Sequence, residues 1–197
     1  MIAHHHEPGV HLQPALFLDR DGVILENRPD YLRSWEEAAF IPGALAAIAR
    51  LKDLPLRIVI VTNQSVVGRG LVLPEEAKAI NLKMVDAVVL AGGRIDAVYM
   101  CPHHPEQRCN CRKPRPGLLL QAAEDLLLDL PQSTLIGDAL TDLQSGQAAG
   151  VGRLALVLTG LGDSQLPLLV EAGLGEVAHF DDLEQALEQL LPTSSFR

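Results

Sequence analysis

The sequence predicts an α/β fold in which a doubly wound parallel sheet is covered by helices on both faces. Short, almost continuously apolar runs alternate with helix-length amphipathic segments along the chain. A strand that is apolar at nearly every position is typical of a parallel sheet buried on both faces. Strands that alternate with helices favour the doubly wound, Rossmann-like arrangement.

Six apolar runs are the predicted strands, and four helices have recognisable beginnings. The strands cover 15–18, 57–62, 97–100, 133–136, 154–158 and 177–180. The helices begin near Pro42 and Pro74, run over 118–128, and extend from 181 to 191. Proline suits the first helical turn, where its missing N–H has no partner to lose. Glu75 and Glu76 favour the positive end of the second helix.

Length and composition bound the kind of protein. A chain of 197 residues, 48% of them hydrophobic, is large enough for one well-buried core. We expect a single domain over 13–192 after a disordered tail over 1–12, with His4–His6 as a solvated part of that tail. The segment 23–41 is too short for a separate cap domain.

Charge and hydropathy disfavour several classes of partner. The net charge of −9 argues against a nucleic-acid or membrane-surface binder, because such proteins usually present a basic face. No apolar run approaches the roughly 18 residues that span a bilayer, and the N-terminus lacks a signal-peptide pattern. We expect a cytoplasmic monomer that acts on a small molecule.

All three cysteines fall within eleven residues, which predicts a metal site. Cys101, Cys109 and Cys111 together with His103 form a Cys₃His set suited to tetrahedral Zn²⁺. Four protein ligands leave no open position, so this zinc would be structural. His104 is an alternative imidazole ligand. The other interpretation is that the cysteines are small buried apolar residues.

Four polar clusters follow four of the predicted strands, at 19–22, 62–65, 101–113 and 137–142. In doubly wound sheets the ligand crevice lies beyond the carboxyl ends of the strands. The clusters are therefore expected to converge on one crevice. Each alone could be a helix cap or a turn, because Asp, Asn, Thr and Ser favour both.

The residue types in these clusters predict phosphoryl transfer. Asp19 and Asp21 are two apart, so in extended backbone their side chains point the same way, and Asp138 arrives from a neighbouring strand. Three carboxylates repel one another unless a cation joins them, and hard oxygen ligands suit Mg²⁺. Thr62 and Lys113 supply a hydroxyl and an ammonium that can hold phosphoryl oxygens.

These motifs resemble those of the haloacid-dehalogenase-like (HAD) phosphatases, in order and from 17 to about 160. The matching residues are Asp19-x-Asp21-Gly22, Thr62-Asn63, Lys113 and Gly137-Asp138-x-x-x-Asp142. The segments 19–22, 61–65 and 101–114 resemble more narrowly the heptose 1,7-bisphosphate 7-phosphatases, a group that includes histidinol-phosphate phosphatases on the same zinc-loop scaffold.

The resemblance implies the catalytic roles. Asp19 would form an aspartyl-phosphate, and Asp21 would protonate the leaving sugar oxygen and then deprotonate water. The carboxylates of Asp19 and Asp138 and the backbone carbonyl of Asp21 would bind Mg²⁺. We expect neighbouring carboxylates to keep Asp21 protonated at the start of the reaction.

The resemblance also implies the substrate contacts. Thr62 and Lys113 would hold the phosphoryl group, Arg112 would help to recognise the substrate, and Asp142 would orient Lys113 or a metal-bound water. Further expected contacts are Asn27, Arg28, Tyr31, Asn63, Gln64 and Ser65. Arg28 could equally be a solvated charge, and Arg69 could meet a second phosphate or point to solvent.

Two features of this chain depart from the heptose phosphatases, so other substrates and functions stay open. Heptose phosphatases often carry Lys after the fourth-motif aspartate, where this chain has Ala139, and only five residues separate His103 from Cys109. Histidinol phosphate is therefore the alternative substrate. From other classes, a non-catalytic receiver-like domain and a zinc-held interaction module are the alternatives.

Overall fold

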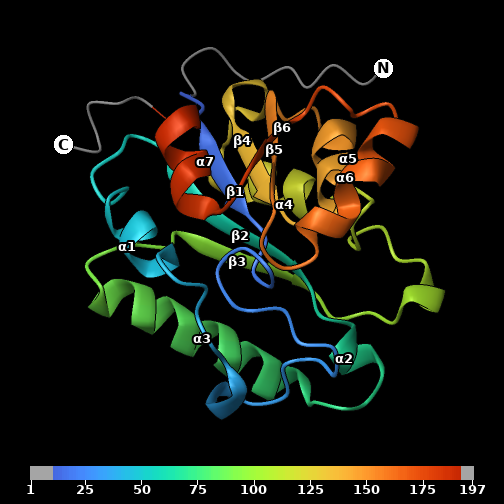
Figure 1. The fold of residues 1–197 in the computed structure, drawn as a ribbon. Helices are drawn as coiled ribbons and strands as arrows, with labels where there is room; N and C mark the ends of the chain where they lie inside the picture. Colours follow the sequence, from blue (N-terminus) through green and yellow to red (C-terminus); the bar gives the residue numbers. More distant parts are fainter. Residues whose placement is uncertain (1–10, 192–197) are drawn as a thin grey trace.

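A computed structural model describes residues 11–191, which form a six-stranded sheet in the order β3-β2-β1-β4-β5-β6 (Figure 1). All five pairs of neighbouring strands are parallel. The strands are β1 Ala15–Leu18, β2 Arg57–Asn63, β3 Ala97–Cys101, β4 Thr134–Gly137, β5 Arg153–Val157 and β6 Ala178–Phe180. The predicted fold class is confirmed, and each strand end differs from its prediction by at most one residue.

Helices cover both faces of the sheet. They are α1 Ala44–Ala49, α2 Ser65–Gly68, α3 Pro74–Leu90, α4 Gly117–Leu126, α5 Leu140–Ala149, α6 Gly162–Glu171 and α7 Leu183–Leu190. Short 3₁₀ turns lie at Trp35–Glu37, Pro105–Gln107 and Leu130–Gln132. Within residues 11–191, no helix combines the length and the apolar character that crossing a bilayer requires.

Strand side chains alternate between two hydrophobic cores. Leu16 and Leu18 of β1 pack into one core with buried residues of α1, α3 and α7, whereas Phe17 packs into the other with α4, α5 and α6. Figure 1 shows these two sets of helices on opposite sides of the sheet. Burial on both faces is the physical reason that the strands are apolar at nearly every position.

Two helix boundaries differ from their predictions. Pro42 precedes α1 instead of lying in its first turn, because Gly43 adopts a left-handed conformation (φ 83°) and the helix begins at Ala44. Helix α4 ends at Leu126, before the predicted residue 128, because Leu127 is left-handed (φ 54°). Of the predicted tail, residues 1–10 and hence His4–His6 lie outside the described residues.

The order in which the chain adds strands to the sheet reverses between β1 and β4, although all strands stay parallel. From β1 the chain continues to β2 and β3 on one side, then returns to place β4 on the other side of β1. Such a switch point opens a crevice at the carboxyl ends of the two central strands. Asp19 directly follows β1, and Asp138 directly follows β4. The fold therefore brings these two carboxylates to the place where ligands bind in this class of sheet.

Candidate active site and zinc site

Three buried carboxylates meet at the switch point. Asp19, Asp138 and Asp142 each offer an oxygen within 4.8 Å of the others. Asp142 lies in the first turn of α5, and its Oδ2 accepts a hydrogen bond from the backbone N–H of Ala139 at 3.1 Å. Asp142 joins Asp19 and Asp138 in this cluster, in the place where the sequence led us to expect the Asp21 carboxylate. Binding of Mg²⁺ by the backbone carbonyl of Asp21 stays a prediction.

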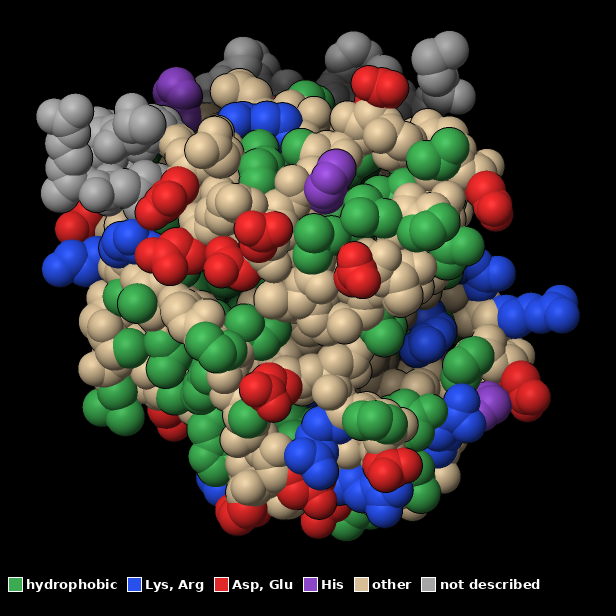
Figure 2. Space-filling model, viewed as in Figure 1, with side chains coloured by type: hydrophobic (Ala, Val, Ile, Leu, Met, Phe, Trp, Pro, Cys, Tyr) green, Lys and Arg blue, Asp and Glu red, His purple; other side chains and the backbone are tan. Residues whose placement is uncertain are grey.

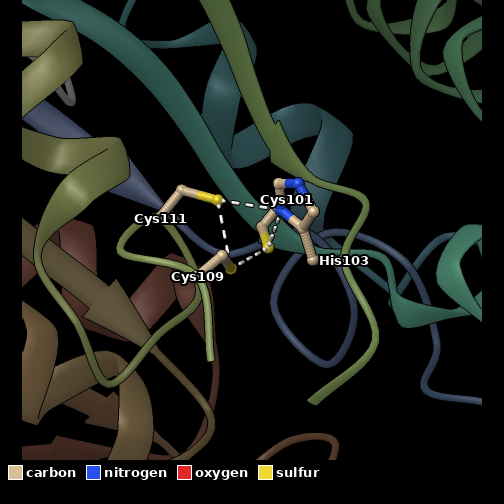
Figure 3. A group of neighbouring side chains, drawn as sticks. All are labelled: Cys101, His103, Cys109 and Cys111. Carbon is tan, nitrogen blue, oxygen red and sulfur yellow. Dashed lines mark hydrogen bonds between the residues drawn. The ribbon is translucent and has the colours of Figure 1, made fainter. Parts of the chain in front are cut away.

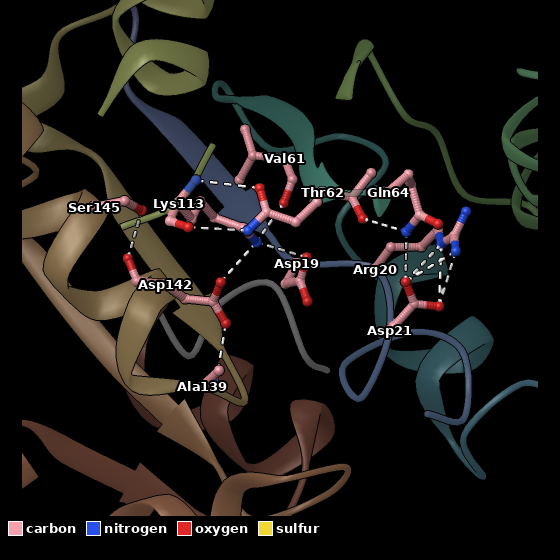
Figure 4. A network of polar contacts seen from close by, with 11 residues as sticks. Asp19, Arg20, Asp21, Val61, Thr62, Gln64, Lys113, Ala139, Asp142 and Ser145 are labelled. Carbon is pink, nitrogen blue, oxygen red and sulfur yellow. Dashed lines mark hydrogen bonds and ion pairs between the residues drawn. The ribbon is translucent and has the colours of Figure 1, made fainter. Parts of the chain in front are cut away.

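Lys113 is the cation that contacts this cluster. Its Nζ lies 2.7 Å from Oδ1 of Asp19 and 2.6 Å from Oδ1 of Asp142, and it donates to the carbonyl oxygen of Val61 at 2.9 Å (Figure 4). Burial alone would lower the pKa of Lys113, but Asp142 and Asp19 raise it above its ordinary value. Lys113 is therefore an ammonium group, and its contact with Asp142 agrees with the predicted orienting partner.

One ammonium does not neutralise three carboxylates. The pKa of Asp19 is raised to about 7, mainly by burial. Lys113 lowers this pKa, whereas the charges of Asp142 and Asp21 raise it further. Burial and the charges of Asp19 and Asp142 raise the pKa of Asp138 to about 8. Buried carboxylates in excess of cations are stabilised by a metal ion, and three hard oxygen donors fit Mg²⁺.

Asp138 is held by close backbone contacts. Its Oδ2 accepts a hydrogen bond from the N–H of Leu161 at 2.9 Å. Gly22 (φ 83°) and Gly160 (φ 63°) both lie against the Asp138 carboxylate, where a Cβ at either position would collide with it. The loops after β1 and β5 therefore require glycine at these two points.

Asn63 holds the backbone of Lys113 through two hydrogen bonds. Its Nδ2 donates to the carbonyl oxygen of Lys113, and its Oδ1 accepts from the N–H of Lys113, both at 3.1 Å. Both polar groups of the amide are thus used inside the protein. The structure thus gives Asn63 a positioning role, and a substrate contact through the second N–H of its amide stays a prediction.

Replacing Asn63 with Ala should loosen Lys113. We expect the loss of two hydrogen bonds to cost about 2 kcal/mol of unfolding free energy and to lower Tm by about 5 °C. Thermal denaturation followed by circular dichroism measures the change. Asn110, which is exposed, is the matched control, and its replacement with Ala should leave Tm within about 1 °C. Equal effects at the two positions would contradict the positioning role.

Asp21 forms a direct ion pair with a guanidinium. Its carboxylate accepts from Nε and Nη2 of Arg20 at 3.2 and 2.9 Å and from Nε2 of Gln64 at 2.7 Å. The same Nε2 of Gln64 donates to Oγ1 of Thr62 at 2.9 Å. A neighbouring carboxylate does act on Asp21, because the charge of Asp21 helps to raise the pKa of Asp19, but the hydrogen bonds of Asp21 come from Arg20 and Gln64. The sequence reasoning missed Arg20 altogether. The signal was present, because a charged residue directly after a buried strand requires a partner.

Three of the expected substrate contacts lie in the segment between β1 and α1. Asn27, Arg28 and Tyr31 are exposed, and Nη1 of Arg28 lies 3.4 Å from the carbonyl oxygen of Glu37. The guanidinium of Arg69 lies over the ring of Tyr31, 5.6 Å from its centroid. Arg69, for which a second phosphate and solvent are the two alternatives, therefore contacts the expected substrate contact Tyr31.

Two further predicted substrate contacts are buried. Gln64 and Ser65 are 6% and 7% exposed, at the start of α2. Gln64 uses its amide N–H group on Asp21 and Thr62, as described above. Gln64 therefore contacts the predicted acid–base residue, and a substrate contact from either side chain stays a prediction.

Basic side chains gather beside the zinc loop, here defined as residues 101–111. Arg108, Arg112, Lys113 and Arg115 help to line a cavity of about 320 Å³. Figure 2 shows Lys and Arg side chains around a hollowed part of the surface on this side of the molecule. Nη1 of Arg112 is buried and has no hydrogen-bond partner among the described residues. A local positive field of this kind can draw an anion toward an otherwise acidic protein.

Cys101, His103, Cys109 and Cys111 form the predicted metal cluster (Figure 3). Nδ1 of His103 lies 3.2 Å from Sγ of Cys111, and Sγ of Cys109 lies 3.6 and 3.4 Å from the sulfurs of Cys101 and Cys111. Tetrahedral zinc with bonds of about 2.3 Å places its sulfur ligands about 3.8 Å apart. The four donor atoms are thus arranged at nearly the spacing that zinc requires.

The zinc loop selects His103 over His104. Nδ1 of His104 accepts from the N–H of Glu106 and lies 3.7 Å from the Glu106 carboxylate, away from the sulfur cluster. Burial, with the neighbouring cysteines, raises the pKa of Cys111 to about 12, so this thiol ionises only when a cation stabilises its thiolate. Of the two imidazoles left open by the sequence, the geometry therefore favours His103.

The chain matches known proteins over most of its length. Residues 110–184 match the HAD-hydrolase-like family. A D-glycero-beta-D-manno-heptose-1,7-bisphosphate 7-phosphatase of Bordetella bronchiseptica is 40% identical over 177 residues, which cover 89% of this chain and 97% of the relative. The Escherichia coli protein of the same name is 38% identical over 154 residues, which cover 75% of this chain and 80% of the relative.

A solved structure supports the same relationship. The D,D-heptose 1,7-bisphosphate phosphatase of B. bronchiseptica, crystallised with magnesium and phosphate, is 39% identical and superimposes with a TM-score of 0.83 over 90% of this chain and 97% of that one. Identity and coverage at this level establish descent from a common ancestor. The chain therefore belongs to the D-glycero-beta-D-manno-heptose-1,7-bisphosphate 7-phosphatase family of HAD-like hydrolases.

Proposed function

We propose that this chain is a Mg²⁺-dependent phosphatase that removes the 7-phosphate of D-glycero-beta-D-manno-heptose 1,7-bisphosphate through an aspartyl-phosphate. The observation that carries the proposal is the buried cluster of Asp19, Asp138 and Asp142 around Lys113 at the switch point of the sheet. The names of the relatives and the magnesium and phosphate bound to the B. bronchiseptica protein support it.

In the first half-reaction, a carboxylate oxygen of Asp19 attacks the phosphorus atom. The bond between phosphorus and the sugar oxygen breaks, and that oxygen takes the proton of the Asp21 carboxyl group. Lys113 and the hydroxyl of Thr62 hold oxygens of the phosphoryl group in line with the attack. The products are an aspartyl-phosphate on Asp19, heptose 1-phosphate and an ionised Asp21.

In the second half-reaction, Asp21 accepts a proton from water as the water oxygen attacks the same phosphorus atom. The bond between phosphorus and Asp19 breaks, which releases inorganic phosphate and restores both aspartates. Arg20 and Gln64 both donate hydrogen bonds to the Asp21 carboxylate, and these contacts hold its oxygens in a fixed position for the proton transfer.

The donor set at the crevice fits Mg²⁺, with Asp19 and Asp138 as the carboxylate ligands and the backbone carbonyl of Asp21 as a further oxygen. When bound, the ion supplies positive charge that stabilises the phosphoryl oxygens in the transition state. Asp142 then acts through Lys113, with which it forms an ion pair at 2.6 Å. Zinc held by Cys101, His103, Cys109 and Cys111 would support the loop that leads into Lys113 and would take no part in the reaction.

Mg²⁺ should stabilise the protein more strongly as pH rises. Without metal, the raised pKa values of Asp19 and Asp138 mean that the folded state binds more protons than the unfolded state between about pH 4 and pH 8. Unfolding free energy then falls as pH rises, by up to about 1.4 kcal/mol per pH unit for each proton. Mg²⁺ replaces those protons, so its stabilising effect should increase over the same range.

Thermal denaturation with and without Mg²⁺ measures this coupling. We expect the Mg²⁺-induced rise in Tm to be several degrees larger at about pH 8 than at about pH 6. Asp138→Asn, which removes one predicted ligand, should abolish most of the difference. A shift that is equal at the two pH values would contradict a Mg²⁺ site built on these carboxylates.

The choice of substrate is tested by comparing turnover of heptose 1,7-bisphosphate with turnover of histidinol phosphate. Ala139 leaves the position after Asp138 without the lysine that heptose phosphatases often carry, so the cation for a second phosphate must come from elsewhere. Arg112, whose Nη1 is buried without a partner among the described residues, is the candidate. A higher kcat/KM for the bisphosphate supports the proposal, and a preference for histidinol phosphate would overturn it.

We also propose a cellular location, an oligomeric state and a class of partner for this chain. A Cys₃His zinc site requires reduced thiols, which supports a cytoplasmic location. We infer a monomer of one domain that binds a small sugar phosphate, and neither nucleic acid nor a membrane. Size-exclusion chromatography with light scattering tests the monomer.

A further inference from the structure

Arg20 is a fully buried cation whose function the proposed reaction does not yet explain. Its side chain is 1% exposed, and among the fully buried side chains of residues 11–191 it is the largest. A charge taken out of water in this way is costly unless it is paired and its hydrogen-bonding groups are satisfied. The partners of Arg20 therefore indicate what its position serves.

Both sides of the Arg20 guanidinium are occupied. On one side Nε and Nη2 each lie within 3.3 Å of both oxygens of Asp21, which is a bidentate arrangement (Figure 4). On the other side Nη1 donates to Oδ1 of Asn81 at 2.8 Å. Because the guanidinium is planar and rigid, a bond to Nη1 fixes the plane in which Asp21 is held.

Asn81 is a polar residue on an otherwise apolar face of α3. It is 6% exposed and shares the buried face of the helix with Ala77, Ile80 and Met84. Its Nδ2 lies 3.5 Å from Sδ of Met100, a weak acceptor. The strong hydrogen bond of Asn81 is therefore the one to Arg20. An apolar side chain would pack at this position of α3 equally well, so the amide is explained by its bond to Arg20.

From these contacts we propose that Asn81 is a positioning residue that acts through Arg20 to hold the carboxylate of Asp21 in place for proton transfer. The inference rests on the proposed function, because it assumes that Asp21 transfers the protons. Gln64, which follows the neighbouring parallel strand β2, completes the arrangement with its bond to Asp21 at 2.7 Å. Helix α3 thereby contributes to the reaction through a side chain that does not itself meet the substrate.

The test compares steady-state kinetics of Asn81→Ala and Asn81→Asp with those of the unaltered chain, on heptose 1,7-bisphosphate with saturating Mg²⁺. Proton transfer by a positioned group contributes roughly 10²- to 10⁴-fold, so losing part of its alignment in Asn81→Ala should lower kcat by about 10-fold. KM should change by less than about 2-fold, since the phosphate contacts are untouched. Asn81→Asp keeps the Oδ1 atom that accepts from Arg20, so its kcat should lie within about 3-fold of that of the unaltered chain.

Asp86→Asn, an exposed position on α3, is the control and should leave kcat unchanged. All rates are divided by the folded fraction from circular dichroism, so partial unfolding of Asn81→Ala cannot imitate the effect. Unchanged kcat in Asn81→Ala, or a loss that Asn81→Asp does not restore, would overturn the inference. Failure of the unaltered chain to release phosphate would overturn the proposed function itself, which is a distinct result.

Discussion

Replacing Asp19 with Asn should lower kcat by at least about 10⁴-fold, because removing a covalent nucleophile removes the reaction path and not one contact among many. An amide neither forms the phosphoryl ester nor supplies an anionic metal ligand. The residual rate should be close to that of the protein without Mg²⁺. Phosphate release under saturating substrate and Mg²⁺ measures the change.

The same substitution should not destabilise the protein. Burial raises the pKa of Asp19 to about 7, so at about pH 8 the group is mostly ionised and the folded state carries the free-energy cost of burying its charge. An uncharged amide of the same shape avoids that cost and should keep Tm at or above the original value. Asp163→Asn, at an exposed position in the first turn of α6, is the control and should leave both kcat and Tm unchanged. More than about one-hundredth of the original kcat in Asp19→Asn would contradict a covalent role.

Loss of zinc should have the largest effect on stability. Structural zinc supplies on the order of 10 kcal/mol of folding free energy in small zinc domains, and part of that should be lost when Cys109 is replaced with Ser. If about 4 kcal/mol is lost, Tm falls by roughly 10 °C or more. The zinc loop also leads into Lys113, so kcat should fall by at least about 100-fold as the ammonium loses its position.

Metal analysis and thermal denaturation on the same samples test this prediction. The unaltered chain should contain about one zinc per molecule, and Cys109→Ser should contain much less. His104→Ala is the matched control, because His104 contacts Glu106 and lies away from the cluster; its zinc content and Tm should stay close to the original. A zinc-free protein with unchanged Tm would exclude the structural role.

The sheet could be predicted from the sequence almost residue by residue. Its strands are short apolar runs buried on both faces, and this pattern has few other physical explanations. Helix ends were less predictable, because they depend on single backbone conformations. The left-handed φ of Gly43 sets the start of α1, and the left-handed φ of Leu127 sets the end of α4. The spacing of apolar residues in the sequence does not reveal either conformation.

The site was predicted in part. The residues that follow strands could be placed at one edge of the sheet by topology alone, which brought Asp19, Asp138 and Lys113 together correctly. The direction of a side chain after a strand could not be predicted, because the chain turns there. Asp21 therefore faces Arg20, and Asp142, in the first turn of α5, completes the carboxylate cluster.

Two supporting residues could have been found with closer attention to burial. Arg20 lies between two aspartates directly after an apolar strand, where a cation without a partner would be costly. Asn81 falls four residues after Ala77 and three before Met84, which places an amide on the buried side of the helix. Only the structure shows that these two residues bond to each other.

The most direct test of the central claim is phosphorus NMR of heptose 1,7-bisphosphate during turnover, with Mg²⁺, by the unaltered chain and by Asp19→Asn. The account predicts that the unaltered chain releases the 7-phosphate, that the anomeric phosphate stays on the sugar, and that Asp19→Asn leaves the bisphosphate intact. Release of the anomeric phosphate, or release that continues without Asp19, would contradict it.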